Sequence, residues 1–419
     1  MQVATPIRLL APRIRPREDP GAFVEEALDF IRLNVKPDEK VKVMVSGGTD
    51  SLLTAVLFNF VIGDRLYVTH SDTNFMRLIR GKKESEIVAA KLSSYFKNFK
   101  LRDDRELFFG KIRGVQDAET KRRIFRDLYT KISEEEMELD GCSVLTQGTI
   151  FPDIVETDTG IKAQSNVQMP TVKKIVEPIA CLYKDEVRKA TKYLAEEHGI
   201  RFLEEFVARQ PFPGPGLSVR VVGSITPVNL NLEREANDIF EQRVEEYTKS
   251  LYGVPLHIDP ITGEQIPFQW FTAVIKKDAI APSGDVGIAI RKYCGEKKFR
   301  EKILSEKATA IKKGSRDYSS PLCLQCYDLD YDTLTRMGME LPNNFDISRV
   351  LYHVANGNKF SDYSVTMRCV RSIDANKASV FELPMALIRN IGEEIAEKCR
   401  VAEVFYDFSG KPPATIEYE

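Results

Sequence analysis

The stretch from residue 41 to residue 60 constrains the fold more than any other part of this chain. It begins with the apolar, β-branched run VKVMV at residues 41–45, continues as the small-residue string SGGTDS at 46–51, and ends in the apolar segment 52–60. A buried strand, a short loop and a helix in this order are typical of one unit of a parallel α/β sheet. The loop is therefore predicted to lie between the carboxyl end of a strand and the start of a helix.

The residues of this loop predict a binding site for an anion. Gly47 and Gly48 have no Cβ atoms, so their backbone N–H groups can approach a phosphate closely, and the helix start adds partial positive charge. Ser46 and Ser51 add hydroxyl donors. Asp50 would repel a phosphate unless a Mg²⁺ ion lies between them. An ordinary glycine-rich turn needs only the glycines, so the full SGGTDS string favours phosphate binding.

SGGTDS resembles the pyrophosphate-binding loop of the N-type ATP pyrophosphatases. These enzymes split ATP between its α and β phosphates while they adenylate a substrate oxygen. The resemblance implies that ATP is a substrate, that Mg²⁺ accompanies it, and that Thr49 belongs to the ATP-binding loop together with its neighbours.

Strand and helix patterns alternate through the first half of the chain. Further strands are expected at residues 65–69 and 142–145, and helices at 22–35, 82–97, 118–137 and 184–198. This alternation implies a parallel, doubly wound α/β sheet whose ligands bind at the carboxyl ends of the strands. Asp72 and the run Gln147, Gly148 and Thr149 follow two of the expected strands. We therefore expect them near the SGGTDS loop.

A connector rich in proline and glycine marks the expected domain boundary. Residues 211–216, PFPGPG, hold three prolines and two glycines, which makes a stiff and irregular segment. We expect an irregular N-terminal lead-in over residues 1–18, where prolines and arginines are frequent. A nucleotide-binding domain is expected over 19–208 and an α+β domain over 209–419.

Composition limits the class of protein. The chain has 419 residues, of which 43% are hydrophobic, so it can bury the cores of two or three domains. Its net charge of −2 gives no overall basic field for nucleic acid, and no apolar stretch reaches the roughly 18 residues of a membrane span. Seven scattered cysteines, an odd number, favour reduced thiols. These features predict a soluble cytoplasmic protein without membrane or nucleic-acid partners.

Four further strings make a more specific resemblance, to the synthetase half of the GMP synthetases. They are QGTIFPDIVET at 147–157, KDEVR at 184–188, RQPFPGPGLSVRV at 209–221 and YDFSGKPPATIEYE at 406–419. The similarity runs from about residue 19 to the C-terminus and is weakest between about 250 and 365. It implies a ligase that uses ATP to aminate XMP to GMP through an adenylated intermediate, and a homodimer formed by the C-terminal domain. No glutamine amidotransferase segment precedes the motifs, so ammonia is expected from a separate subunit or from solution.

The resemblance also implies roles for residues of the first domain. The SGGTDS loop would hold the β and γ phosphates with Mg²⁺ on Asp50, and Asp72 would lie near the ribose or the metal. Asp153 is placed for contacts with the metal or the adenylate. Lys162 is a candidate to neutralise charge that develops on the α phosphate. A solvated surface charge is the alternative for Lys162.

A second group of residues is implied in binding the nucleotide substrate. Lys411 and the backbone near Thr415 would bind its phosphate, and Glu417 would accept hydrogen bonds from its base or ribose. A solvated surface charge is again the alternative for Arg77 and Lys411. The complete group is Arg77, Arg209, Lys411, Thr415, Ile416 and Glu417.

Two segments depart from the family pattern. The family string IKSHHNVGGLP is replaced at residues 161–170 by IKAQSNVQMP, which lacks the histidine pair and both lid glycines. The family's MTA element is missing after residues 365–377, VTMRCVRSIDANK. The changes predict that ATP binding is retained and that XMP is a poor substrate. The alternatives to a GMP synthetase are a paralogue that aminates or thiolates another nucleotide-like molecule, and a catalytically silent binding subunit.

Cysteine and histidine patterns add little to these hypotheses. Cys323 and Cys326 form a lone CxxC pair, which fits two ordinary thiols, a metal or dimer contact, or sulfur chemistry. The four histidines show no spacing typical of metal ligands. His70 follows an expected strand, and we expect it to fill space in the core.

Overall fold

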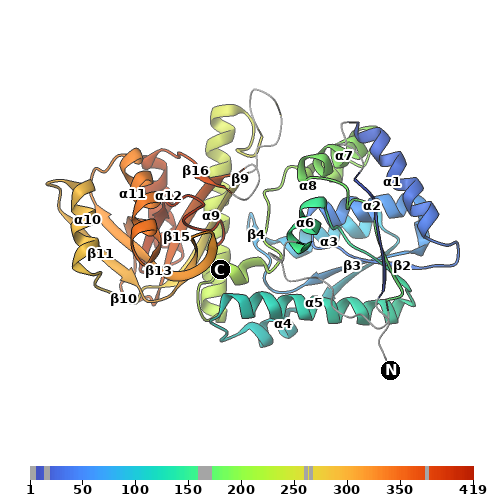
Figure 1. The fold of residues 1–419 in the computed structure, drawn as a ribbon, viewed down its shortest axis with the longest axis horizontal. Helices are drawn as coiled ribbons and strands as arrows, with labels where there is room; N and C mark the ends of the chain where they lie inside the picture. Colours follow the sequence, from blue (N-terminus) through green and yellow to red (C-terminus); the bar gives the residue numbers. More distant parts are fainter. Residues whose placement is uncertain (1–5, 14–18, 159–171, 259–262, 264–267, 373–376) are drawn as a thin grey trace. The chain divides into compact units, whose positions relative to one another are not determined.

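The computed structural model describes residues 6–13, 19–158, 172–258, 263, 268–372 and 377–419 (Figure 1). It divides into two compact units. The first comprises residues 1–74, 83–109 and 123–209, and the second comprises 75–82, 110–122 and 210–419. The second unit thus takes two short segments from the first half of the chain that sequence patterns did not assign to it. Each unit has its own sheet and core.

The first unit is built on a six-stranded sheet in which all neighbouring strands are parallel. Its strand order is β1-β8-β7-β2-β3-β6. The strands are β1 (Ile7–Leu10), β2 (Val41–Met44), β3 (Leu66–Asp72), β6 (Asn98–Asp103), β7 (Val144–Thr146) and β8 (Lys174–Glu177). The predicted doubly wound parallel sheet is confirmed.

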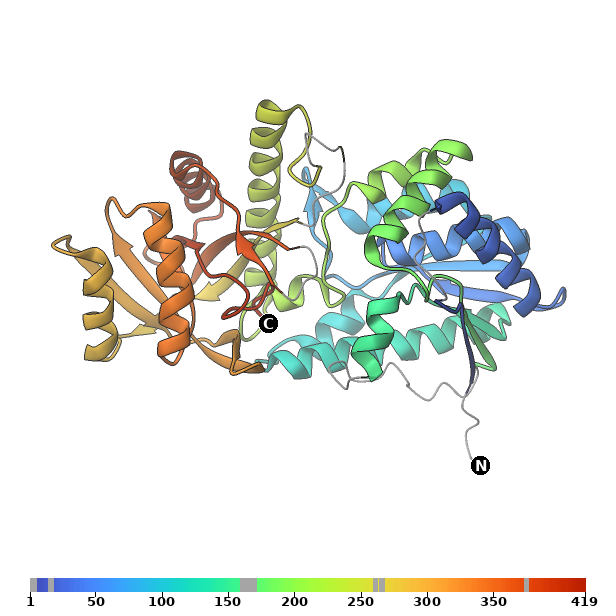
Figure 2. The same cartoon turned by 45° about the horizontal axis from the view of Figure 1, so that its top comes forward.

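Helices cover both faces of this sheet. They are α1 (Pro20–Asn34), α2 (Thr49–Ile62), α3 (Glu84–Tyr95), most of α4 (Arg105–Ile112) and of α5 (Ala118–Asp140), α6 (Phe151–Asp158), α7 (Lys184–Glu197) and α8 (Phe202–Val207). Side chains alternate along β2, so Val41 and Val43 enter the core with α1 and α2 while Lys42 points to α5. Both views show α5 on the opposite face from α1 and α2 (Figures 1 and 2).

The expected irregular lead-in is wrong for residues 7–10. These residues form β1, which pairs with β8 in parallel register from Ile7 opposite Lys174 to Leu10 opposite Glu177. The four residues IRLL have a strand-like pattern, but neighbouring prolines and arginines masked it in the sequence. A strand this short depends on its partner strand for stability, which local patterns do not reveal.

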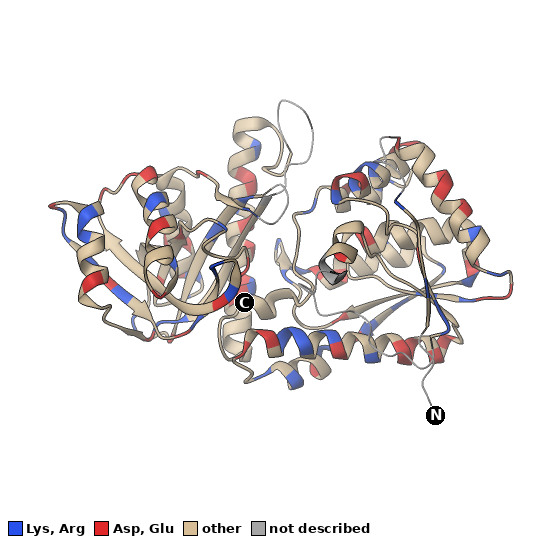
Figure 3. Cartoon of the chain, in the orientation of Figure 1, with Lys and Arg blue, Asp and Glu red and all other residues tan. Residues whose placement is uncertain are grey.

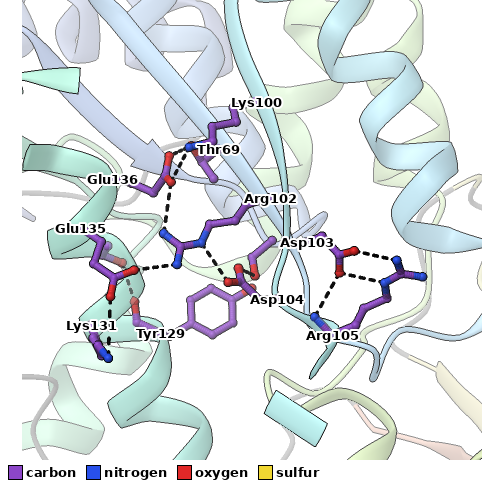
Figure 4. A network of polar contacts seen from close by, with 12 residues as sticks. Thr69, Lys100, Arg102, Asp103, Asp104, Arg105, Tyr129, Lys131, Glu135 and Glu136 are labelled. Atoms are coloured by element: carbon purple, nitrogen blue, oxygen red, sulfur yellow. Dashed lines mark hydrogen bonds and ion pairs between the residues drawn. The ribbon is translucent and has the colours of Figure 1, made fainter. Parts of the chain in front are cut away.

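Helix α5 carries its charges against the preference of a helix dipole. Lys and Arg gather in its first half, and Asp and Glu gather near its end (Figure 3), whereas the dipole favours the reverse. The sheet compensates the acidic end. Fully buried Glu136 accepts hydrogen bonds from Lys42, Lys100 and Arg102 at 3.3, 2.7 and 3.1 Å, respectively. Figure 4 shows the contacts of Glu136 with Lys100 and Arg102, which join α5 to β6.

The charged partners of Glu136 change its titration. Burial alone would raise the pKa of this carboxyl group, but the hydrogen bond from Lys100 and the charge of Lys42 hold the pKa at about 2. The carboxylate is therefore ionised at neutral pH and fixes α5 to the sheet. The predicted long charged helix at 118–137 is confirmed, while its sheet partners were not predictable from the helix alone.

The second unit contains a nine-stranded mixed sheet with the main order β10-β11-β13-β14-β17-β15-β16, with β12 on β13 and β9 on β15. Its sheet strands are β9 (Phe268–Lys276), β10 (Ala279–Ile280), β11 (Phe299–Leu304), β12 (Ala308–Lys312), β13 (Ser315–Cys326), β14 (Ile347–Asn356), β15 (Tyr363–Arg371), β16 (Ser379–Val380) and β17 (Glu403–Asp407). The helices are α9 (Pro227–Tyr252), α10 (Gly284–Cys294), α11 (Tyr331–Asn344) and α12 (Met385–Lys398), and a separate hairpin pairs β4 (Leu78–Ile79) with β5 (Lys82–Lys83). The predicted α+β class of this part is confirmed.

A buried ionic cluster anchors the C-terminal tail to this sheet. Asp407 has no exposed surface and accepts hydrogen bonds from Arg349 at 2.9 Å, Arg368 at 2.6 Å and the Tyr418 hydroxyl at 2.9 Å. Burial opposes ionisation, but the two guanidinium groups lower the pKa of Asp407. Each charge of the cluster is thus partnered, which is the condition for burying it without a large penalty.

No helix among the described residues is both long and apolar enough to cross a bilayer. All seven cysteines are buried and free of disulfide bonds, as the odd number predicted.

Candidate functional site

The SGGTDS loop lies at the point where the strand order of the sheet reverses. From β2 the chain proceeds outward to β3 and β6, and then returns to β7 on the other side of β2. The loops that follow β2 and β7 therefore diverge at adjacent carboxyl ends, the usual place for a ligand in such sheets. SGGTDS follows β2 and residues 147–149 follow β7, so the sequence placed both loops correctly.

The loop has the backbone form expected of an anion cradle. Gly47 has a φ of +87°, which a residue with a side chain rarely adopts, and Gly48 is the N-cap of α2. The Ser46 and Ser51 hydroxyl oxygens lie 3.3 Å apart, and Ser46 N–H donates to Ser51 Oγ at 3.3 Å. Ser46 and Gly48 are exposed, so the loop is open to a ligand. Thr49 differs, because its buried hydroxyl donates to the backbone oxygen of Phe206 at 3.2 Å.

The loop after β7 packs directly on the SGGTDS backbone. A Cβ atom added to Gly148 would lie 2.5 Å from the backbone nitrogen of Ser51, so glycine is required there. Thr149 donates a hydrogen bond to Glu177, a fully buried residue at the end of β8. The contact between Gly148 and the Ser51 backbone confirms the predicted proximity of the two loops.

Asp50 forms an ion pair with a lysine at the start of α7. Lys184, the first residue of α7, places its Nζ atom 2.6 Å from Oδ1 and 2.6 Å from Oδ2 of Asp50. Arg188 follows one turn later on the same helix face. Burial lowers the pKa of Arg188, and the charges of Asp50 and Asp185 oppose that shift. Two basic side chains therefore accompany the carboxylate beside the loop.

Asp72 and Asp153 act as capping residues of turns. Asp72 accepts hydrogen bonds from the Asn74 backbone N–H and from the Ser85 hydroxyl, both at 3.0 Å. Asp153 accepts one from the Ile150 backbone N–H at 3.1 Å, at the start of α6. Asp72 ends β3 and so lies at the same edge of the sheet as the loop.

His70 fills space in the core, as expected. It is fully buried, and its Nδ1 atom lies 2.7 Å from the backbone oxygen of Val45, immediately before the loop. Burial lowers its pKa, so the ring is neutral at physiological pH. Within the described residues, its Nε2 atom has no hydrogen-bond partner. Its contact with Val45 supports the strand end from which the loop departs.

The residues implied in substrate binding are divided between the two units. Arg209 belongs to the first, where it contacts Glu84 at 3.3 Å and stacks 4.3 Å from the centre of the Phe206 ring. Arg77 belongs to the second. It is buried and contacts Glu241 at 2.9 Å, so it is not the solvated surface charge of the alternative.

The other four residues of that group lie on the C-terminal tail. Glu417 forms a two-point contact with fully buried Arg220 at 3.0 and 3.1 Å. The Thr415 hydroxyl donates to the backbone oxygen of Thr309 at 3.1 Å, and Ile416 packs on a hydrophobic cluster of the sheet. Lys411 is half-buried, and its backbone pairs with that of Ala378.

The final residue is also fixed. Glu419 accepts hydrogen bonds from Lys121 and, at 2.8 Å, from the Gly223 backbone N–H. Burial raises the pKa of Glu419 to about 7, although the Lys121 charge opposes the shift. The tail thus presents its side chains from a backbone that is held along its length.

Comparisons with known proteins bear on both halves of the chain. A family model described as GMP synthase C terminal domain matches residues 353–418. A subunit of the glutamine-hydrolyzing GMP synthase of Saccharolobus solfataricus is 34% identical over 415 residues, which cover 96% of this chain and 100% of that protein. The protein of the same name from Methanopyrus kandleri is 33% identical over 406 residues and covers 96% of this chain and 99% of its own.

The chain belongs to this family of GMP synthase subunits.

Membership in the family confirms the resemblance given by the separate motifs and makes the chain a ligase. Among solved structures, an NH3-dependent NAD synthetase from Campylobacter jejuni matches 45% of this chain and 81% of its own. Its sequence identity is 20% and its TM-score 0.34, values too low to bear on function.

Sequence reasoning missed the contact between Lys184 and Asp50 in this family member. The string KDEVR was recognised, but neither of its basic residues was given a role. The available signal was the spacing of Lys184 and Arg188, four residues apart at the start of a helix that follows a strand of the same sheet. Their common face was predictable, whereas its direction toward Asp50 depends on how α7 packs.

Some predicted features lie outside the described residues. Lys162 and the altered segment 161–170 are among them, as are residues 373–376 of the second altered segment. The CxxC pair is described. Cys323 and Cys326 enter different hydrophobic clusters because positions three apart on a strand face opposite sides. Burial raises the pKa of Cys323, which favours an ordinary core thiol over a metal ligand or sulfur carrier.

Proposed function

We propose that this member of the GMP synthase family converts XMP to GMP with ATP and ammonia, and releases AMP and pyrophosphate. The observation that carries the proposal is the SGGTDS loop at the reversal of strand order, open to solvent and faced by Lys184. A loop of this form suits the two phosphates that leave together, because backbone N–H groups and a helix start bind anions. Curated relatives of nearly equal length carry the name of that synthase.

The reaction proceeds in two displacements. The carbonyl oxygen at C2 of XMP attacks the α phosphorus, the bond to the bridging α–β oxygen breaks, and pyrophosphate leaves. Ammonia then attacks C2, the bond from C2 to the adenylated oxygen breaks, AMP leaves, and the new amino group loses a proton. Adenylation thus turns a poor leaving oxygen into a good one, and the enzyme contributes chiefly by positioning and by stabilising charge.

The residues of the first unit have proposed roles in the first displacement. The SGGTDS loop holds the β and γ phosphates, and Lys184 adds positive charge beside them. Mg²⁺ would be held by the Asp50 carboxylate together with phosphate oxygens, where it would offset their negative charge. Among the described residues, no group of three or more His, Cys, Asp or Glu side chains could hold a metal ion. Asp72 is proposed to lie near the ribose or the metal, and Asp153 to contact the metal or the adenylate. Lys162 is proposed to neutralise charge that develops on the α phosphate.

The substrate-binding residues are proposed to recognise a purine monophosphate. Lys411 supplies positive charge for the phosphate, and the held backbone at Thr415 and Ile416 supplies N–H donors. Arg77 already binds Glu241, and Glu417 already binds Arg220. The charges of Arg77 and Glu417 are therefore largely compensated when these residues recognise polar groups of the nucleotide. Arg209 completes this set.

Two protein partners are proposed. The relatives are named as one subunit of a glutamine-hydrolyzing enzyme, so we propose that a separate glutamine amidotransferase subunit supplies ammonia. We also propose a homodimer formed through the second unit. One chain has a mass of 47.6 kDa. A sedimentation measurement at micromolar concentration should give twice this mass, and a result equal to the mass of one chain would contradict the dimer.

The test of the proposed function is turnover by the purified chain with ATP, Mg²⁺, XMP and excess ammonium. GMP should form at about 1 to 10 per second if this is a working synthase subunit, a rate that would overturn the prediction that XMP is a poor substrate. The altered segment 161–170 favours a second candidate, a paralogue that aminates another nucleotide. AMP release with some other nucleotide, and none with XMP, would support the paralogue. No AMP release across a panel of nucleotides would contradict both.

A further inference from the structure

Residues 6–13 form an N-terminal arm that precedes all the family motifs quoted from the sequence. The arm adds β1 to the edge of the first unit's sheet and carries two arginines that enter the unit. Arg8 lies within β1 and Arg13 three residues after its end. Neither residue belongs to one of the family motifs. Their contacts nevertheless lead to the two loops of the candidate site.

The first contact runs from Arg8 to the loop after β7. Arg8 binds the fully buried carboxylate of Glu177 with two nitrogen atoms, at 2.5 and 3.0 Å. The same carboxylate accepts the hydroxyl hydrogen of Thr149. Gly148, the residue before Thr149, lies against the backbone of Ser51. Arg8 therefore compensates the negative charge of Glu177, to which the loop after β7 is hydrogen-bonded through Thr149.

The second contact runs from Arg13 to the start of α7. Arg13 binds Glu186 with two nitrogen atoms, at 2.7 and 3.0 Å, and also donates to the backbone oxygen of Cys181. Its guanidinium group stacks 4.5 Å from the centre of the Tyr183 ring and 5.5 Å from that of Phe151. Only 15% of the Arg13 side chain and 9% of that of Glu186 are exposed.

Glu186 connects Arg13 to the lysine of the site. Its carboxylate accepts a hydrogen bond from the Tyr183 backbone N–H at 2.7 Å and so caps the first turn of α7. The next residue is Lys184, whose Nζ atom binds both carboxylate oxygens of Asp50. Arg13 thus contacts Tyr183 and Glu186, which lie before and after Lys184 in the chain.

We propose that Arg13 is a positioning residue that fixes Lys184 beside Asp50 and thereby prepares the SGGTDS loop to bind pyrophosphate. The proposal rests on the proposed function, in which that loop holds the leaving phosphates. A two-point contact from a planar guanidinium fixes direction as well as distance, which a lysine cannot do. The alternative is that Arg13 only stabilises the fold.

The test is the binding of inorganic pyrophosphate in the presence of Mg²⁺, measured by calorimetry on the full chain. Four proteins form a double-mutant cycle: wild type, Arg13→Gln, Lys184→Gln and the double variant. Arg13→Gln should weaken binding about tenfold, as loss of a residue that orients a ligating group commonly does. In the Lys184→Gln background, the same change should weaken binding less than about twofold, because the side chain that Arg13 positions is gone.

Arg65→Gln is the matched control. Arg65 also joins two segments of the first unit, through the backbone oxygens of Lys36 and Glu39 at 2.7 and 2.9 Å, but it lies before β3 at the amino edge of the sheet. It should leave pyrophosphate affinity within about twofold of wild type. Arg13→Lys keeps the positive charge but loses the two-point guanidinium contact, and it replaces Arg13→Gln in the test if that variant does not fold. It should weaken binding at least about threefold with an unchanged midpoint of thermal unfolding.

The possible outcomes separate the proposal from the function on which it rests. Wild-type affinity in a folded Arg13→Gln or Arg13→Lys protein would overturn the positioning role. If Arg13→Gln weakens pyrophosphate binding as much in the Lys184→Gln background as in wild type, the positioning role is also overturned. Arg13 would then affect binding without acting through Lys184. If wild type itself does not bind Mg²⁺-pyrophosphate, the proposed role of the SGGTDS loop fails first.

Discussion

At the scale of single residues, the site is organised around the charge of Asp50. A carboxylate next to a phosphate loop needs a cation, and the sequence suggested Mg²⁺. The structure supplies a second cation from the protein itself, since Lys184 binds both oxygens of Asp50 at 2.6 Å. Removal of the carboxylate would therefore disturb both the metal proposed to arrive with ATP and the lysine proposed to meet its phosphates.

We expect Asp50→Asn to lower Mg²⁺-dependent pyrophosphate release by at least about 100-fold, the usual effect of losing one group that stabilises developing charge. The fold should remain intact, because Asp50 is part-exposed and asparagine has the same shape. Release of pyrophosphate from ATP measures the effect. Asp64→Asn is the control, because Asp64 is a surface residue paired with Lys97. Near-normal turnover by Asp50→Asn would remove the loop from the mechanism.

At the scale of elements, the site depends on how two loops fit together. Gly148 comes within contact distance of the Ser51 backbone, where even a methyl group has no space. Its backbone is not in the left-handed region, so the constraint comes from the neighbouring loop and not from the turn itself. The effect of a substitution there should consequently be seen in ligand binding.

Gly148→Ala should raise the dissociation constant for ATP by about 10- to 100-fold, the range expected when a binding group is displaced by about 1 Å. Equilibrium binding of a non-hydrolysable ATP analogue measures it. Gly110→Ala is a matched control, because Gly110 lies in a helix with open space at its Cβ position. An ATP affinity for Gly148→Ala equal to that of the control would show that the loops do not act together.

The network on α5 should contribute stability and not catalysis. Glu136→Gln removes the fully buried negative charge that Lys42, Lys100 and Arg102 share, and although Lys42 keeps Asp140 at 2.5 Å, we expect unfolding free energy to fall by about 3 kcal/mol. The control, Glu135→Gln, removes a more exposed partner of Arg102 and should cost less than about 1 kcal/mol. Because the pKa of Glu136 is lowered to about 2, the difference between wild type and Glu136→Gln should be present above pH ~4.5 and vanish as pH falls toward 2. Urea unfolding at several pH values would measure it, and an equal loss from both variants would contradict the role of this carboxylate.

The sequence predicted those elements whose local pattern agrees with their final environment. The SGGTDS loop, its strand and helix, and the run 147–149 were placed correctly because apolar periodicity and glycine positions are local signals. Strand β1 was missed because four residues between prolines and arginines depend on β8 for their structure. The direction of Lys184 toward Asp50, and of Glu136 toward Lys42, depends on packing between elements far apart in the chain. No local signal contains that information.

At the scale of the whole molecule, the C-terminal residue is part of the interior of the second unit. Glu419 is buried against Lys121, and its pKa is raised to about 7. A carboxyl group with a raised pKa stabilises the folded state fully below its unfolded pKa, about 4.5, and loses that contribution as pH rises through 7. The stability of this unit should thus depend on pH in a range where most carboxyl groups no longer titrate.

Glu419 should contribute a fall in unfolding free energy of up to about 1.4 kcal/mol per pH unit between pH ~4.5 and 7, and this contribution should be absent from Glu419→Gln. The chain's single tryptophan, Trp270, is buried in the second unit, so its fluorescence reports on that unit during urea unfolding. Equal slopes in wild type and variant would show that Glu419 does not hold a proton in this range.

The most direct test of the central claim follows the carbonyl oxygen of the substrate. XMP labelled with ¹⁸O at C2 is incubated with the purified chain, ATP, Mg²⁺ and ammonium, and the products are analysed by mass spectrometry. Adenylation of that oxygen predicts one ¹⁸O atom in the phosphate of each AMP formed, with unlabelled pyrophosphate and GMP in equal amounts. AMP without the label, or ADP and phosphate in place of AMP and pyrophosphate, would contradict the account.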